Sequence, residues 1–138
     1  MTALAPIALE EFHRRKASVD AAVAHSGFAR QEGERLLRCW LAIALTAGAK
    51  PSECGPEVDR WQGSLADHYA RFLLLEELPP RDQWLGELTR ARDAAARKAR
   101  NHPTNVELGT RHHALDSLCI YLGGAPETQP VQQEREAA

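Results

Sequence analysis

The segment Pro56–His102, PEVDRWQGSLADHYARFLLLEELPPRDQWLGELTRARDAAARKARNH, decides the fold because two helical patterns of opposite charge meet in it at Pro79-Pro80. Two consecutive prolines end a helix, since proline lacks an amide hydrogen and keeps the residue before it out of the helical region. The first arm is acidic, with Glu57, Asp59, Asp67, Glu76 and Glu77 against Arg60 and Arg71. From Leu88 the second arm is basic, with Arg90, Arg92, Arg97, Lys98 and Arg100 against Asp93. The pattern predicts a charge-polarised helical hairpin of residues 57–78 and 81–102.

The two arms differ in their apolar faces. Helical spacing places five large side chains of the first arm on one face, which we expect to be buried: Val58, Trp61, Leu65, Tyr69 and Phe72. Phe72–Leu75 spreads apolar groups further around the helix, which indicates either deep burial, the interpretation we favour, or a partner surface. Beyond Leu88 the seam of the second arm is alanine only, so this arm buries little apolar area there and is held less firmly.

The remaining sequence predicts three more helices and no strand. These are expected over 7–25, over 29–47, and from a Thr104/Glu107 capping box, or from Thr110, to the glycines at 123–124. The second half of 29–47, CWLAIALTA, is apolar on every side and predicts the centre of the bundle, followed by a loop over 50–56. We therefore expect an all-α fold: one compact five-helix bundle over 1–124 with a flexible tail over 125–138.

Composition limits the class of protein. The chain has 138 residues, of which 43% are hydrophobic and 26% charged, with a net charge of −2, so any nucleic-acid-like basic surface must be local. Its three cysteines form no CxxC pair, and its start carries charge too early for a signal peptide, which favours a cytoplasmic location. The longest uncharged run, Cys39–Ala49, is about half the length that crosses a bilayer, so we expect no membrane span.

Arg97-Lys-Ala-Arg-Asn-His102 is the sharpest chemical motif in the sequence. It resembles the Rx4-6H signature of HEPN-type ribonucleases, which are small helical-bundle proteins. The resemblance covers these six residues and implies that Arg97 steadies a phosphorane while His102 moves a proton of an RNA phosphodiester. The alternative is that Arg97 is solvated and His102 lies at a helix C-terminus, where an imidazolium is favoured by the helix dipole.

His112, Asp116 and Cys119 share one stripe of the last predicted helix. Residues seven apart on a helix are about 10 Å apart along its axis, too far for His112 to activate the Cys119 thiol. His112 and Asp116 are metal-ligand candidates if other helices add ligands. The alternative, a buried Cys119 beside a surface pair, is the one we favour, and we expect no metal and no cofactor.

The basic arm supplies the candidate binding residues: Arg90, Arg92, Arg97, Lys98, Arg100 and His102. They suit either a protein partner or, as the alternative, several phosphates of a nucleic acid, although no aromatic residues accompany them to stack on bases. We predict a non-catalytic helical protein that acts through protein–protein interaction, as an adaptor, inhibitor or assembly subunit, with nucleic-acid binding and ribonuclease activity as alternatives. The charge asymmetry also suits an antiparallel homodimer, in which each basic arm meets an acidic one.

Overall fold

The fold was determined as a computed structural model, which describes residues 4–25, 30–59 and 66–124. These ranges contain six helices and no strand, which confirms the all-α prediction. The helices are α1 (Leu4–His25), α2 (Arg30–Thr46), α3 (Pro51–Cys54), α4 (Asp67–Glu77), α5 (Arg81–Asn101) and α6 (Val106–Leu122). Among the described helices, none combines the length and apolar character that a bilayer span requires.

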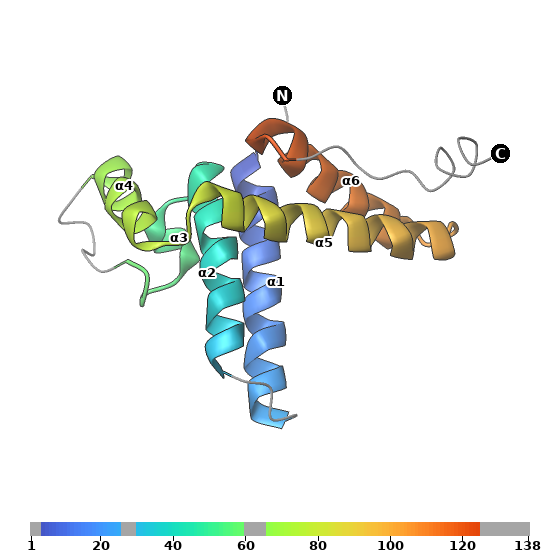
Figure 1. Ribbon diagram of the computed structural model, residues 1–138, viewed down its shortest axis with the longest axis horizontal. Coiled ribbons are helices and arrows are strands. Elements are labelled where there is room, and N and C mark those ends of the chain that lie inside the picture. Colours follow the sequence, from blue (N-terminus) through green and yellow to red (C-terminus); the bar gives the residue numbers. More distant parts are fainter. Residues whose placement is uncertain (1–3, 26–29, 60–65, 125–138) are drawn as a thin grey trace.

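Two antiparallel helix pairs make up most of the structure (Figure 1). α1 packs along α2, and α5 packs along α6; the second pair lies across the first near one end, so the molecule is angular rather than a parallel bundle. α2 contacts α5 where the pairs cross, while α6 contacts α1. This arrangement leaves an inner corner between α1 and the far half of α5.

The centre of the core is α2, as its all-round apolar sequence predicts. Its second half is buried almost without interruption, at Cys39, Trp40 and Ala42–Leu45. A left-handed glycine ends it: Gly48 has φ +110°, and the Ala49 amide donates to the Ala44 carbonyl at 3.0 Å. This six-residue closure satisfies carbonyls that the last helical turn leaves unpaired.

The acidic arm differs most from the sequence prediction. No helix starts at residue 57: α3 occupies part of the expected loop, a turn follows at 56–58, and α4 begins only at Asp67. The expected buried residues Trp61 and Leu65 lie outside the described residues. α4 packs against α2 and α3, whereas α5 packs mainly against α6, so the expected hairpin of 57–78 and 81–102 is replaced by an α5–α6 hairpin.

The alanine seam of α5 is buried, at Ala91, Ala95 and Ala96. Trp84 and Leu88 are the larger apolar groups that α5 buries. Burying a leucine stabilises a fold by about 1.5–3 kcal/mol, so the small residues set the spacing and the leucines supply most of the free energy.

α6 begins one residue later than the capping-box pattern predicts. Asn105, not Thr104, is its N-cap, and the Asn105 side chain accepts a hydrogen bond from the Leu108 amide at 3.2 Å. The helix ends at Leu122, and Gly123 with φ +88° closes it. Arg81 of α5 donates to the Leu122 carbonyl at 2.8 Å and so fixes the end of α6 to the start of α5. The expected flexible tail, 125–138, lies outside the described residues.

Candidate functional site

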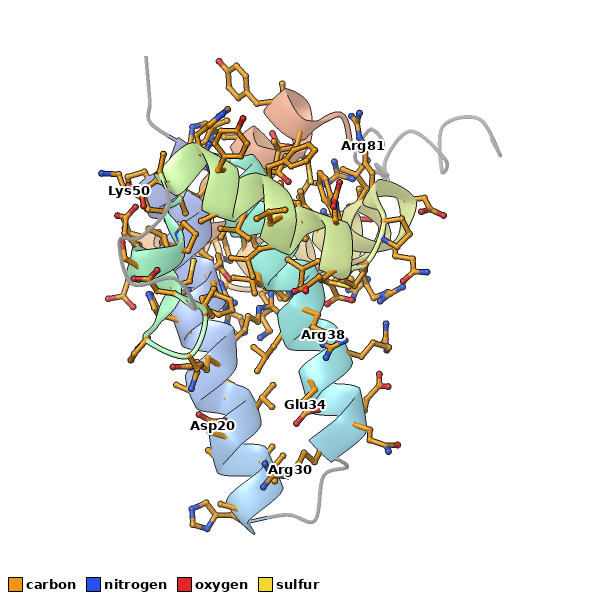
Figure 2. All side chains as sticks on the ribbon, turned by 90° about the vertical axis from the view of Figure 1, so that its left-hand side faces the viewer. Asp20, Arg30, Glu34, Arg38, Lys50 and Arg81 are labelled. Carbon is orange, nitrogen blue, oxygen red and sulfur yellow. The ribbon has the colours of Figure 1, made fainter. Side chains whose placement is uncertain are left out.

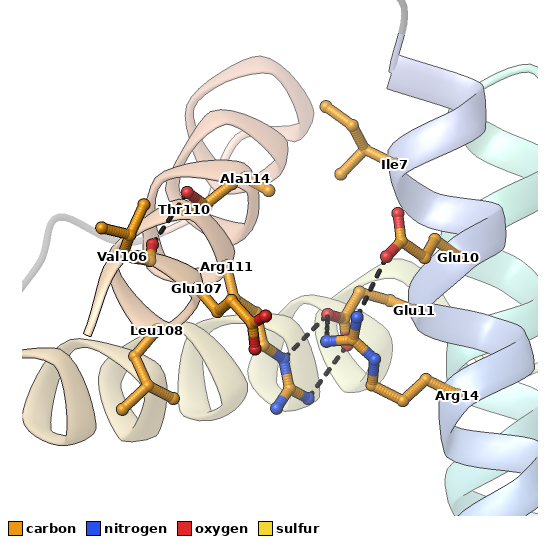
Figure 3. Close-up of a pocket in the computed structure, with 10 residues that line it drawn as sticks. All are labelled: Ile7, Glu10, Glu11, Arg14, Val106, Glu107, Leu108, Thr110, Arg111 and Ala114. Carbon is orange, nitrogen blue, oxygen red and sulfur yellow. Dashed lines mark hydrogen bonds and ion pairs between the residues drawn. The ribbon is translucent and has the colours of Figure 1, made fainter.

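A cavity of about 710 Å³ lies between α1 and α6 (Figure 3). Its walls are aliphatic at Ile7, Val106, Leu108 and Ala114, and its floor is charged. The remaining lining residues are Glu10, Glu11, Arg14, Glu107, Thr110 and Arg111. An apolar wall above a few convergent charges is the usual composition of a ligand site.

Glu11 is the centre of that floor. Its side chain is only 5% exposed, yet it accepts hydrogen bonds from Arg111 of α6 at 3.0 and 3.3 Å and from Arg14 of α1 at 3.3 Å. A third guanidinium, that of Arg15, lies 3.6 Å away. Buried carboxylates require such partners, because a carboxylate that loses its water without gaining a partner costs several kcal/mol. The Glu11–Arg111 pair thus joins helices 100 residues apart in the chain.

Arg15 is enclosed between this network and the core. Its guanidinium lies 4.6 Å from the centre of the Trp40 ring, a cation–π distance, and its Nε atom is buried without a hydrogen-bond partner. Loss of hydration lowers the pKa of Arg15, and the nearby Glu11 carboxylate offsets part of that effect. Arginine stays charged regardless, so a poorly hydrated cation is held beside the inner corner of the molecule.

A second cavity, of about 260 Å³, opens in this inner corner. It is lined by four cations from three helices, one carboxylate and three alanines: Arg15, Arg90, Lys98, Arg111, Glu87, Ala91, Ala94 and Ala95. Glu87 is nearly buried and pairs with Arg90 at 2.7 Å. The alanines create the space, and the cations surround it.

The predicted binding residues of the basic arm divide into two groups. The first group is exposed: Arg90, Arg97, Lys98 and Arg100 of α5, together with His102 that follows it. Arg92 corrects the prediction, because it is only 2% exposed and therefore offers no surface to a partner.

Two contacts reduce the free-energy cost of burying the Arg92 cation. It lies on a flank of α5 near Cys119 of α6, and its guanidinium donates twice to Asp93, at 3.1 and 3.0 Å. The neighbouring carboxylate neutralises the cation, so the pair can enter the interface.

The two residues of the ribonuclease motif lie at the C-terminal end of α5. α5 ends at Asn101, and His102 occupies the C-terminal cap with its backbone amide donating to the Lys98 carbonyl at 3.1 Å. Arg97 and His102 are both exposed, and neither lines the two cavities described above.

The stripe of His112, Asp116 and Cys119 on α6 is partly buried, which supports the interpretation of Cys119 as a buried core residue beside a surface pair. Cys119 is buried beside α5, where its thiol lies 3.9 Å from the Leu88 carbonyl, and burial raises its pKa to about 11. His112 and Asp116 are partly exposed. Within the described ranges, no group of three histidine, cysteine, aspartate or glutamate side chains converges as a metal site.

An apolar surface appears on α4 that the sequence placed in the core. Tyr69 and Phe72 are 60% and 58% exposed and Leu73 is also exposed, while Ala70 and Leu74 are buried. In Figure 2, α4 lies on the side of the molecule that faces the viewer. The apolar run Phe72–Leu75 permits several helical registers with an apolar inner face, and the structure uses the one that buries Leu74. The large aromatic residues consequently point outward.

Sequence reasoning missed the Glu11–Arg15–Arg111 cluster. One signal was present: Glu11 stands between Ala8 and Phe12 on the buried stripe of α1, where a carboxylate is expected only with buried partners. The partner on α6 carries no comparable signal. Comparison with known proteins adds no guide to function, since no family model, no curated protein and no solved structure matches this chain.

Proposed function

We propose that this chain is a non-catalytic helical protein that acts through protein–protein interaction, with the outer face of α4 as its main contact surface. The observation that carries the proposal is the exposure of Tyr69, Phe72 and Leu73 side by side on one short helix. Aromatic residues are enriched at the centres of interfaces, where they bury a large area with few rotatable bonds. Two aromatic side chains and a leucine on a single exposed face exceed the scattered apolar residues of an ordinary surface.

The partner that fits this face is a second copy of the chain. α4 surrounds its apolar face with Asp67, Glu76 and Glu77, whereas the far end of α5 exposes Arg97, Lys98 and Arg100. Beyond the turn, Val106 adds an exposed apolar side chain to that basic end. α4 and this basic end lie at opposite ends of the long axis of the molecule (Figure 1). An antiparallel two-fold dimer would therefore bring each acidic aromatic face onto the basic end of the other copy.

This interpretation uses the cations of α5 better than the nucleic-acid alternative does. Burial of Arg92 and the pairing of Arg90 with Glu87 leave fewer basic groups for phosphates than the sequence indicates. In the described part of the molecule, no aromatic residue is exposed on α5 to stack on bases.

Sedimentation analysis of the full chain tests the proposal. We expect a concentration-dependent dimer, which Phe72→Ser abolishes and Ile120→Ser leaves intact, because Ile120 is equally apolar and 68% exposed but lies on α6. If the parent protein stays monomeric at about 100 µM, the dissociation constant is too high for a stable dimer, and the proposed partner is overturned. Equal effects of the two variants overturn the assignment of α4.

Charge reversal provides a second, independent readout. Glu76→Lys and Arg97→Glu should each weaken the dimer, and the two together should restore it, because the opposite charges then face each other again. Additive weakening in the double variant contradicts the antiparallel arrangement. Incubation of the parent protein with a mixed RNA pool covers the ribonuclease alternative: cleavage that Arg97→Ala or His102→Ala removes would replace this proposal.

A further inference from the structure

The inner-corner cavity of about 260 Å³ carries an excess of positive charge that the fold itself leaves unmatched. Four cations line it: Arg15, Arg90, Lys98 and Arg111. Two carboxylates offset them, Glu87 through Arg90 and Glu11 through Arg111 and Arg15. Two positive charges therefore remain within one small concave space.

Lys98 is the cation of the cavity that is open to a ligand. Its ammonium group enters no ion pair among the described residues and lies one helical turn beyond Ala94 on the same side of α5. Arg15 Nε is buried and lies 3.6 Å from the Glu11 carboxylate, so Arg15 adds its positive charge to the cavity wall rather than an open Nε donor. An anion in the cavity would be attracted by both cations.

The dimensions select a compact ligand. Pockets for drug-sized molecules measure about 300–1,000 Å³, so this cavity is smaller than that range. Its floor is formed by Ala91, Ala94 and Ala95, which expose no polar side-chain atom that would compete for the cations. The low hydration that lowers the pKa of Arg15 also strengthens the attraction between this guanidinium and an entering anion.

We propose that this corner is a binding site for a phosphate monoester or inorganic phosphate, held between Arg15, Lys98 and Arg111. A terminal phosphate carries about −1.5 to −2 charges at neutral pH, which matches the excess of two cations. The planar guanidinium group of arginine can donate to two phosphate oxygens at once, and lysine adds a point charge at the mouth of the cavity. A backbone phosphodiester carries one charge and two sugar substituents, so it matches the cavity less well.

The test is an NMR titration of the full chain with inorganic phosphate. A titration with chloride at the same ionic strength is the control for nonspecific effects of an anion. We expect saturable shifts of residues around the cavity. Lys98→Gln should weaken the phosphate affinity about tenfold, the value of one charge-assisted hydrogen bond. Arg97→Gln is the matched control, because it removes the same charge from the adjacent, exposed position outside the cavity, and it should change the affinity less than about twofold.

A variant that fills the cavity distinguishes binding inside it from nonspecific attraction of phosphate to the positively charged surface. Ala94→Leu keeps every charge and should abolish phosphate binding while the circular dichroism spectrum stays unchanged. The proposal fails if the parent protein shows no saturation by about 10 mM phosphate. It also fails if Lys98→Gln and Arg97→Gln weaken binding equally, or if a short RNA binds with steep salt dependence and ignores Ala94→Leu.

Discussion

Replacing the buried carboxylate Glu11 by glutamine should destabilise the protein far more than the same change at its neighbour Glu10. The Glu11 side chain is 5% exposed and holds Arg111 through two hydrogen bonds, whereas Glu10 is 72% exposed and pairs with Arg14. Removing one member of a buried ion pair costs about 3–5 kcal/mol. Arg15 and Arg111 retain some access to water, so we expect about 2–3 kcal/mol for Glu11→Gln.

The control Glu10→Gln should cost less than about 0.5 kcal/mol, the usual value of an exposed pair spaced i,i+4. Urea unfolding followed by far-ultraviolet circular dichroism gives both values, provided that the slope of free energy with urea is unchanged. Glu11→Leu combined with Arg111→Met should recover only part of the loss, because the apolar pair removes the Arg111 charge but leaves Arg15 without the Glu11 carboxylate. Equal destabilisation by Glu11→Gln and Glu10→Gln would refute the assignment of Glu11 as the charge that joins α1 to α6.

Three further predictions concern the helix ends and the buried thiols. Gly123→Ala should destabilise the fold by about 1 kcal/mol or more, since φ is +88° and a Cβ atom would meet the Arg81 guanidinium. Gly109→Ala should instead stabilise the fold by about 0.5–1 kcal/mol, because Gly109 lies inside a helix with open space around it. Thermal unfolding distinguishes the two signs. Asn105→Ala should cost about 1 kcal/mol in the same assay, and a comparable loss in Thr104→Ala would show that the N-cap is misassigned. Burial raises the pKa of Cys119 to about 11, so the unfolded chain releases the thiol proton at a lower pH than the folded chain does. The free energy of unfolding should therefore fall from about pH 9 towards pH 11. Cys119→Ala should make this fall less steep, and an unchanged slope would contradict the raised pKa.

The parts of the fold that local sequence determines were predicted well. The apolar run of α2 identified the centre of the core, and the bounds of α5 agree with the expected 81–102 to within one residue. Both depend on features that one element carries by itself: an all-round apolar surface, and a proline pair before Arg81. Helix length and termination are decided by such local features.

The choice of partner faces could not be predicted in the same way. In α4 four apolar residues follow one another, so periodicity alone does not show which of them faces the core, and Phe72 proved exposed. Arg92 looked like its neighbours in sequence, but α6 covers its side of α5 and Asp93 neutralises it. The Glu11–Arg111 contact joins residues 100 positions apart, a distance over which helical spacing carries no information.

That long separation also has a kinetic consequence. The pairs α1–α2 and α5–α6 are each joined by short connections and can close quickly, whereas the contact of Glu11 with Arg111 requires almost the whole intervening chain to be ordered. We therefore expect the transition state for folding to contain the two hairpins but not this contact. Changes at Glu11 should then accelerate unfolding and leave the folding rate nearly unaltered, so the contact would set how long the native state persists once it has formed.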